Sequence, residues 1–373
     1  MLAEAQVREL AVDDKRERRR FIALERELVG AEPLFVGDTD GDVDKRLGGH
    51  SAFCDETECT LLIASNGRDV ARCAPIVNRR WQRHGARDDA GFIGYFAAAP
   101  DAEAAVAAML EAAEAWLAGR GVRRMLVPFN GTSFLGFGTQ VDAFDEEPMF
   151  PLPWQPAHYA ALFEAAGYEP AYPFWVYEVD FASEPYRIAA RRALDDARCT
   201  VRPFDKKRWD EELELLRRLQ NETFCDEWEF HPMTREEYAE FFGDWKQFFD
   251  ERQCLFAEVD GEPAGFCWGL PDWTPLFRSF KGKMGPVQIV RFMRHAKRFD
   301  RAGLLMIGVR PSHRGRHIGQ TLAASLYRHY EELGLKSAFY YPVNEDNLAS
   351  RRLAESFGGR GRNLTTVYEK RLG

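Results

Sequence analysis

The sequence lacks several features that would restrict its function. No apolar run is long enough to cross a bilayer, and the start, MLAEAQVREL, has neither the basic nor the apolar region of a secretory signal. An excess of positive charge is also missing: the formal net charge is −9, which excludes a protein that coats nucleic acid indiscriminately. These absences predict a cytoplasmic protein with no membrane span and no nucleic-acid partner.

Cysteine pairs of the metal-binding or redox kind are also missing. The seven cysteines are odd in number, and none of them forms a CxxC motif. Several lie in apolar runs typical of strands. The pattern therefore predicts buried, reduced thiols and neither a disulfide framework nor a metal site.

The chain has 373 residues, which suggests two domains, and its two halves resemble each other. Val7-Arg8 recurs 194 positions later as Val201-Arg202. Near the end of each half, six residues recur with an offset of 191: Leu162, Glu164, Gly167, Val176, Tyr177 and Glu178 become Leu353, Glu355, Gly358, Val367, Tyr368 and Glu369.

A hairpin signal adds a third match. Asn66-Gly67 and Asp260-Gly261 each lie between apolar runs, and the two turn glycines are 194 positions apart. Three matches in the same order predict two copies of one fold. We expect domains at 1–183 and 200–373, a linker helix at 184–199, and a helical insert at 271–301 in the second domain.

The second half shows an alternation of strands and helices. An apolar strand is expected at Leu304–Val309, because it lacks polar residues and reads as the interior of a sheet. A helix over Thr234–Arg252 should begin with a capping box, since Glu237 follows Thr234 by three residues. Together these signals predict an α/β fold, with a mixed sheet and helices on both faces.

The loop after the apolar strand carries the most specific chemistry. It reads Arg310-Pro311-Ser312-His313-Arg314-Gly315-Arg316-His317-Ile318-Gly319 and leads directly into a helix. Unpaired amides and the dipole at a helix start attract anions, and glycines allow close approach of the backbone. The segment therefore predicts a site for a pyrophosphate.

This segment resembles motif A of the GNAT superfamily, whose loop reads Gln/Arg-x-x-Gly-x-Gly/Ala. The sequence supplies Arg314, His317 and Gly319 at these positions, so the middle glycine is replaced by histidine. Asn344–Asn347 and Leu353–Gly358 resemble motif B. More narrowly, the chain resembles tandem-GNAT bacterial proteins, which implies two tandem GNAT folds of which the first is degenerate.

The resemblance implies which residues bind the CoA thioester. Gly308 and Val309 would pair with pantetheine, Asn344 would lie by the thioester, and the strands around this point would splay apart. The full set of expected cofactor-binding residues is Gly308, Val309, Arg314, Gly315, Arg316, His317, Ile318, Gly319, Asn344 and Asn347. Acetyl-CoA is the expected co-substrate, and no metal is expected.

The catalytic groups of the family cannot be carried over directly. Leu304–Ile307 contains no acid, and Ala354 stands where many GNAT enzymes place a tyrosine. Between the first two helices of the second half lie Asp226 and three residues that we predict as catalytic: Glu227, Glu229 and His231. Tyr341 is the predicted proton donor, with its neighbour Tyr340 as an alternative.

The insert is strongly basic. It holds eight lysines and arginines against Asp272 and Asp300, and Ile289, Phe292, Met293 and Ala296 form an apolar stripe. One interpretation is a helix packed on the domain with a solvated basic face. The alternative is a contact for an acidic substrate, the CoA 3′-phosphate, an acyl-carrier protein or a membrane surface.

The first half lacks the anion-binding loop. Its corresponding strand, Gly91–Phe96, is followed by Ala97–Asp101, which has no glycine and no basic residue. We expect Asp101 to cap the helix Ala102–Ala118, which would repel a phosphate. The aromatic, proline-rich segment Phe144–Tyr159 is a candidate wall of the acceptor site.

The sequence thus predicts an N-acyltransferase that moves an acetyl group from acetyl-CoA to an amine in a ternary complex. Two alternatives stay open: a long-chain acyl or acyl-carrier-dependent N-acyltransferase, and a non-catalytic CoA-binding regulatory protein. Peptidyl transfer is disfavoured by the intact loop. Because a tandem pair can stand in for a homodimer, a monomer is expected.

Overall fold

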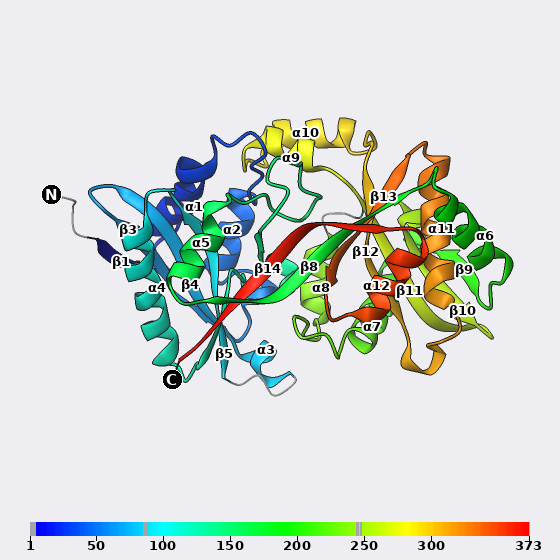
Figure 1. Ribbon diagram of the computed structural model, residues 1–373, viewed down its shortest axis with the longest axis horizontal. Helices are drawn as coiled ribbons and strands as arrows, with labels where there is room; N and C mark the ends of the chain where they lie inside the picture. The colour runs from blue at the N-terminus through cyan, green and yellow to red at the C-terminus, as the bar shows by residue number, and fades with distance from the viewer. Residues whose placement is uncertain (1–4, 85–88, 244–245, 247, 373) are drawn as a thin grey trace.

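The computed structural model describes residues 5–84, 89–243, 246 and 248–372. Two lobes lie side by side and share one continuous mixed sheet (Figure 1). The strand order is β1-β3-β4-β5-β6-β14-β8-β13-β12-β11-β10-β9, with β2 and β7 pairing beside this path. The α/β fold class is therefore confirmed.

The first half contributes the following elements: β1 Gln6–Leu10, α1 Lys15–Val29, α2 Asp40–Leu47, β2 Thr57–Cys59, β3 Leu61–Ser65, β4 Asp69–Asn78, α3 Arg79–Arg83, β5 Ala90–Ala98, α4 Glu103–Ala118, β6 Arg124–Val127, β7 Thr139–Gln140, α5 His158–Ala165 and β8 Glu169–Asp180. Helix α6, Glu184–Asp195, follows.

The second half repeats this order. It contains β9 Thr200–Pro203, α7 Trp209–Thr223, α8 Arg235–Gly243, β10 Cys254–Val259, β11 Glu262–Pro271, α9 Thr274–Phe280, α10 Pro286–His295, β12 Ala302–Val309, α11 Ile318–Glu332, β13 Ser337–Asn344, α12 Leu348–Ser356 and β14 Arg360–Arg371. Helices α9 and α10 form the insert, and the repeat predicted from sequence is confirmed.

The two halves exchange their last strands. β14, the last strand of the chain, lies between β6 and β8, while β8 pairs with β13 of the second half. Tyr368 of β14 packs in the core of the first lobe, and the C-terminus lies in that lobe (Figure 1). The domain limits 1–183 and 200–373 remain a sequence prediction, and the sheet runs across both of them.

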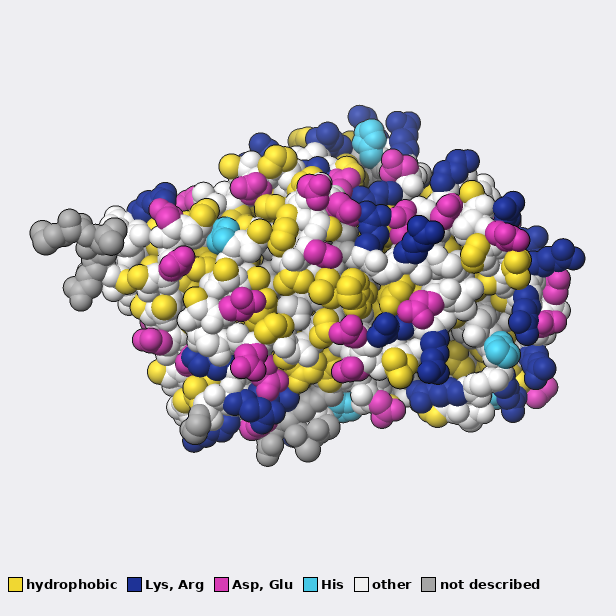
Figure 2. All heavy atoms as spheres, in the orientation of Figure 1, with side chains coloured by type: hydrophobic (Ala, Val, Ile, Leu, Met, Phe, Trp, Pro, Cys, Tyr) yellow, Lys and Arg dark blue, Asp and Glu magenta, His cyan; other side chains and the backbone are white. Residues whose placement is uncertain are grey.

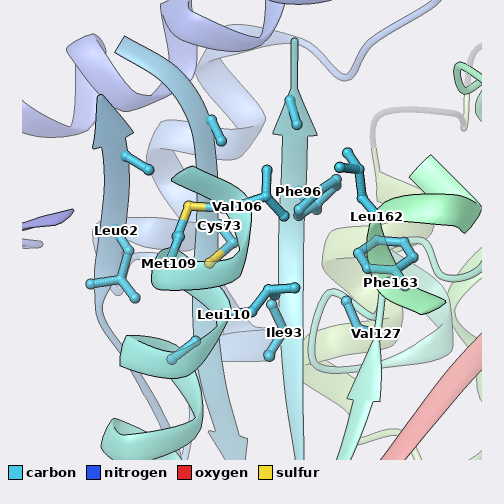
Figure 3. Close-up of a cluster of buried hydrophobic side chains, with 14 of the residues drawn as sticks. Leu62, Cys73, Ile93, Phe96, Val106, Met109, Leu110, Val127, Leu162 and Phe163 are labelled. Atoms are coloured by element: carbon cyan, nitrogen blue, oxygen red, sulfur yellow. The ribbon is translucent and has the colours of Figure 1, made fainter. Parts of the chain in front are cut away.

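The core of the first lobe lies between α4 and the sheet. Val106, Met109 and Leu110 follow each other at helical spacing on α4 and point toward side chains of the strands, among them Leu62 and Ile93 (Figure 3). An equivalent core beneath α11 occupies the second lobe. Each lobe therefore has its own apolar core, to which the exchanged strand of the other half contributes, and the shared sheet joins the two cores.

Helix α8 begins where the sequence predicts and ends earlier than predicted. Its capping box forms as predicted: the Glu237 carboxylate accepts from the Thr234 amide at 2.7 Å, and Thr234 Oγ1 accepts from the Glu237 amide at 3.1 Å. The helix ends at Gly243, whereas we predicted Arg252. Part of the remaining segment, 244–245 and 247, lies outside the described residues.

No helix in the described part of the chain combines the length and the apolar character needed to span a bilayer.

Candidate functional site

The ends of β12 and β13 splay apart. These parallel strands pair only through Gly303 with Phe339 and Leu304 with Tyr340. A bulge follows at once in β12. Trp268 of β11 pairs with Met306 and the next residue, Gly269, pairs with Leu304, so Leu305 has no partner on β11. A bulge bends its strand, so β12 turns away from β13. The predicted splay is confirmed.

Gly308 and Val309 lie at the far end of this splay. They pair with Phe266 and Gly265 of β11, so the opposite edge of their backbone faces the gap. Helix α7 crosses directly above: a Cβ on Gly308 would lie 2.2 Å from Thr223 Oγ1. Glycine at 308 is therefore required for packing, in addition to the role in binding pantetheine that we predicted.

The loop that follows is held at its start and open at its end. The Arg310 guanidinium donates to both oxygens of Glu222, at 2.9 and 3.0 Å, and its amide donates to Ala264 O. Gly315 has φ +79°, a left-handed conformation that favours glycine. Ile318 is 1% exposed and anchors the first turn of α11 in the core.

His317 occupies the position where the GNAT motif has its middle glycine. Its backbone is left-handed, with φ 61° and ψ 17°, and it makes no side-chain cap of α11. The histidine thus adopts the conformation that the missing glycine would favour. The first amides of α11 remain available as donors, and the helix dipole adds positive potential there.

Two arginines flank these amides. Arg314 and Arg316 are exposed, and neither forms an ion pair with any residue that the structure describes. A Cβ on Gly319 would meet no atom closer than 3.8 Å, so glycine here leaves the approach to the backbone open. The loop can therefore accept a diphosphate through amides and two guanidinium groups.

Asn344, at the end of β13, presents a buried donor. The residue is only 6% exposed. Its side-chain oxygen Oδ1 accepts a hydrogen bond from the Asp346 amide at 2.9 Å, while Nδ2 has no partner among the described residues. An unpaired buried amide costs free energy. A carbonyl of a bound thioester or pantetheine would satisfy it, so Asn344 fits the predicted position beside the ligand.

Glu227 is brought to the same place by Asn347. Asn347 Nδ2 donates to Glu227 Oε1 at 2.8 Å, and Asn347 Oδ1 caps α12 by accepting from the Ser350 amide at 3.0 Å. Burial raises the pKa of Glu227, the charge of Asp226 raises it further, and Arg314 opposes both. A carboxylate with a raised pKa beside a cofactor loop is suited to act as a general base.

Tyr340, our alternative donor, lies near this carboxylate. Its hydroxyl shares a 2.6 Å hydrogen bond with Ser350 Oγ on α12. Burial raises its pKa, and the charge of Glu227 contributes to the rise. The hydroxyl therefore stays protonated at neutral pH and has a proton to donate.

Tyr341, the predicted donor, points the other way. Neighbouring strand residues face opposite sides of a sheet, and Tyr341 packs with Met149, Val176 and Phe339. It is fully buried, its hydroxyl donates to the Phe150 carbonyl, and burial raises its pKa strongly. The structure therefore does not bring Tyr341 to Glu227, and Tyr340 takes its place in our proposal.

Glu229 and His231 lie at the contact between the halves. Trp81 Nε1 donates to the Glu229 carbonyl at 3.4 Å. His231 is 1% exposed, with Nδ1 3.5 Å from Thr132 Oγ1 and Nε2 3.8 Å from Glu237 Oε1. Both residues therefore have neighbours in the first half, whereas Glu227 is held by Asn347 beside α12.

The first half has a different arrangement at the start of α4 and at the ends of β5 and β6. Helix α4 begins after Ala102 with no side-chain cap, so the prediction that Asp101 caps it is wrong; Asp101 lies 3.9 Å from Arg68 instead. At the ends of β5 and β6, Asn130 Oδ1 accepts from the Tyr95 amide at 2.7 Å. Both residues line a cavity of about 380 Å³.

Comparison with known proteins supports the same assignment. Residues 213–358 match the model of the acetyltransferase (GNAT) family. The match places a segment of the acetyltransferase (GNAT) family in the second half of the chain. A tandem GNAT protein from the clavulanic acid biosynthesis pathway has the same fold, with a TM-score of 0.56, 15% identity and 99% of each chain covered. The fold is thus a tandem GNAT fold over the whole chain.

Two curated relatives match over nearly their full length. The bacterial ceramide synthase of Caulobacter vibrioides is 28% identical over 370 residues, covering 95% of this chain and 95% of that protein. Protein YghO of Escherichia coli is 24% identical over 372 residues, covering 96% and 94%. The match of residues 213–358 to the acetyltransferase family supports the conclusion that the protein is an acyltransferase.

Proposed function

We propose that the protein transfers an acyl group from an acyl-CoA thioester to a primary amine, within a ternary complex. The observation that carries this proposal is the position of Glu227: it is held by Asn347 at the splayed strand ends, between the anion-binding loop and the unpaired amide of Asn344. These contacts support a proposed base, thioester site and phosphate site at one edge of the sheet.

In this reaction Glu227 accepts a proton and Tyr340 donates one. An alkylamine with a pKa of about 10.4 is mostly protonated at pH 7, and freeing it costs about 4–5 kcal/mol. The amine first releases its extra proton to solvent. The neutral nitrogen then attacks the thioester carbonyl, Glu227 takes one of its two remaining protons, and that proton afterwards returns through solvent to Tyr340. The C–N bond forms, the C–S bond breaks, and Tyr340 donates a proton to the departing sulfur. Asn344 Nδ2 holds the ligand by hydrogen bonding.

For the substrates, we propose a long-chain acyl-CoA and a long-chain amino alcohol. Ceramide is the amide of a fatty acid with such an amine, and the relative named bacterial ceramide synthase supports this class. Acetyl-CoA with a small amine, which we predicted from sequence, is the competing pair. Monomeric state and cytoplasmic location remain predictions from the sequence.

A matrix of donors and acceptors tests the proposal. The full-length protein is incubated with acetyl-CoA, decanoyl-CoA or palmitoyl-CoA and with sphinganine, spermidine or an aminoglycoside, and free thiol and product mass are measured. Amide formation from a long-chain pair is expected. If free thiol were released only from acetyl-CoA with a small amine, the acetyl transfer predicted from the sequence would be supported instead. CoA binding without thiol release in any combination would indicate a regulatory protein.

A further inference from the structure

Helix α10, in the insert, is fixed to the second half by one narrow face. Phe292 and Ala296 lie on this face and are buried. The Phe292 ring packs edge-on against Trp273, with centroids 5.2 Å apart, and Trp273 Nε1 donates to the Ala296 carbonyl at 2.8 Å. The predicted apolar stripe therefore divides: Ile289 and Met293 do not pack with Phe292 and Ala296 in the core.

A second face of α10 is apolar and exposed. Pro286, Ile289, Val290 and Met293 follow at the i, i+3, i+4, i+7 spacing of one helical face. Val290 is 47% exposed and Met293 is 56% exposed. Val287, 75% exposed, lies where this face borders the basic residues Arg291 and Arg294. Of the eight large hydrophobic residues that are exposed in the described chain, five lie between Met284 and Met293. Such a concentration on one short segment marks an interaction surface.

A third face is basic. Arg291 and Arg294 follow at i and i+3 on α10, and Arg298 lies three residues beyond the end of the helix. Dark blue side chains gather along the upper edge of Figure 2, where Figure 1 places α10. Two of the eight basic residues of the insert, Arg278 and Arg301, are paired with Glu147. The other six form no ion pair with described residues: Lys281, Lys283, Arg291, Arg294, Lys297 and Arg298.

We propose that α10 binds the surface of an anionic bilayer, with Val287, Ile289, Val290 and Met293 in the lipid and the unpaired cations at the headgroups. Apolar and cationic faces side by side are typical of interfacial helices. The charge is complementary to acidic lipids although the whole chain is acidic. The apolar side chains project from a convex helix, which suits insertion into lipid better than docking of a carrier protein.

This inference goes beyond the proposed reaction and rests on the helix alone. Sedimentation with vesicles tests it: the full-length protein is mixed with vesicles of phosphatidylcholine, or of phosphatidylcholine with phosphatidylglycerol. We expect binding to the anionic vesicles that weakens as salt is raised. The Arg291→Gln, Arg294→Gln, Arg298→Gln variant should lower the partition coefficient roughly a hundredfold, at about fivefold per cation.

The apolar face has its own variant and control. Val287→Ser, Val290→Ser, Met293→Ser should also abolish binding, whereas Ile188→Ser and Leu333→Ser, which change exposed apolar residues on other helices, should not. Turnover of water-soluble substrates should be unchanged in every variant, which separates this test from that of the reaction. Absence of vesicle binding, equal loss in the control, or binding of an acyl-carrier protein in place of vesicles would overturn the proposal.

Discussion

Asn347 donates a hydrogen bond of 2.8 Å from Nδ2 to Oε1 of Glu227 and so joins the first turn of α12 to the segment that follows α7. The same asparagine caps α12 through its other side-chain atom. One residue of motif B therefore fixes both a helix start and the carboxylate that we propose as the base. Substitutions at Glu227 and its neighbours therefore distinguish Glu227 from the other candidate bases.

Replacing the carboxylate should affect chemistry and leave cofactor binding intact. We expect Glu227→Gln to lower kcat by about 10²–10⁴-fold, the usual contribution of a general base, while CoA affinity changes little. Thiol release in single turnovers measures the step. Glu229→Gln is the matched control and should keep its rate within a few-fold; the reverse pattern would contradict the assignment.

The pH dependence should respond to the charges around Glu227. The base is active when ionised, so activity falls as pH drops through the raised pKa of Glu227. Asp226 raises that pKa and Arg314 lowers it. Asp226→Asn should therefore move the acidic limb of kcat/KM to lower pH, and Arg314→Gln should move it to higher pH. Shifts in the same direction would show that another group titrates.

The loop cations should govern CoA affinity. The double change Arg314→Gln and Arg316→Gln should weaken CoA binding about a hundredfold or more, because each charge-assisted bond contributes about 1.5–3 kcal/mol. Arg328→Gln, an exposed arginine further along α11, should have no effect. Isothermal titration with CoA measures both, and equal losses would indicate long-range attraction in place of a local site.

Two loop substitutions should have opposite effects on stability. His317 has φ 61° and Gly315 has φ 79°. His317→Gly should leave the free energy of unfolding unchanged or raise it by up to about 1 kcal/mol, since it relieves a left-handed non-glycine residue. Gly315→Ala should lower it by about 1 kcal/mol. Urea unfolding measures both, and a fall with His317→Gly would contradict the backbone assignment.

The contact between the halves should depend on Glu237. Its carboxylate is 1% exposed and lies 2.5 Å from Arg80 of α3. Burial opposes its ionisation, but hydrogen bonds from His231, Arg80 and the Thr234 amide outweigh this and lower its pKa. Glu237→Ala leaves Arg80 without its carboxylate partner, with only the Pro232 carbonyl to accept from it, and should cost about 3–5 kcal/mol.

Thr234→Ala is the control for that substitution. It removes only the cap and should cost about 1 kcal/mol. Because the native pKa of Glu237 is lowered, its ionised form stabilises the protein above the usual carboxyl pKa, and this stabilisation is lost as pH falls through the lowered native value. Denaturation at several pH values checks both points. Equal losses for the two variants would contradict a special role for the Arg80 pair.

Sequence reasoning worked where the signal is local. The hairpin turn at Asp260-Gly261 and the capping box of α8 are set by neighbouring residues, and both are confirmed. The binding role of the loop from Arg314 to Gly319 stays a prediction. The offset of 191 between halves also maps β8 onto β14. Each of these features depends on residues close together in the chain, or on a repeat visible in it.

What the sequence did not reveal depends on contacts between distant residues. The exchange of β8 and β14 is invisible because either copy of the strand fits either sheet. The choice between Tyr340 and Tyr341 depends on which face of β13 meets α12. His231 was predicted as catalytic from its type and its position between the first two helices of the second half, and only the fold places it beside Thr132 of the other half.

A crystal structure with a CoA thioester tests the central claim most directly. The account predicts the pyrophosphate on the amides between Gly315 and Gly319, and the thioester between β12 and β13 within hydrogen-bonding reach of Asn344, with Glu227 facing the acyl carbon. A CoA molecule bound elsewhere, such as in the cavity beside Tyr95 in the first half, would contradict it.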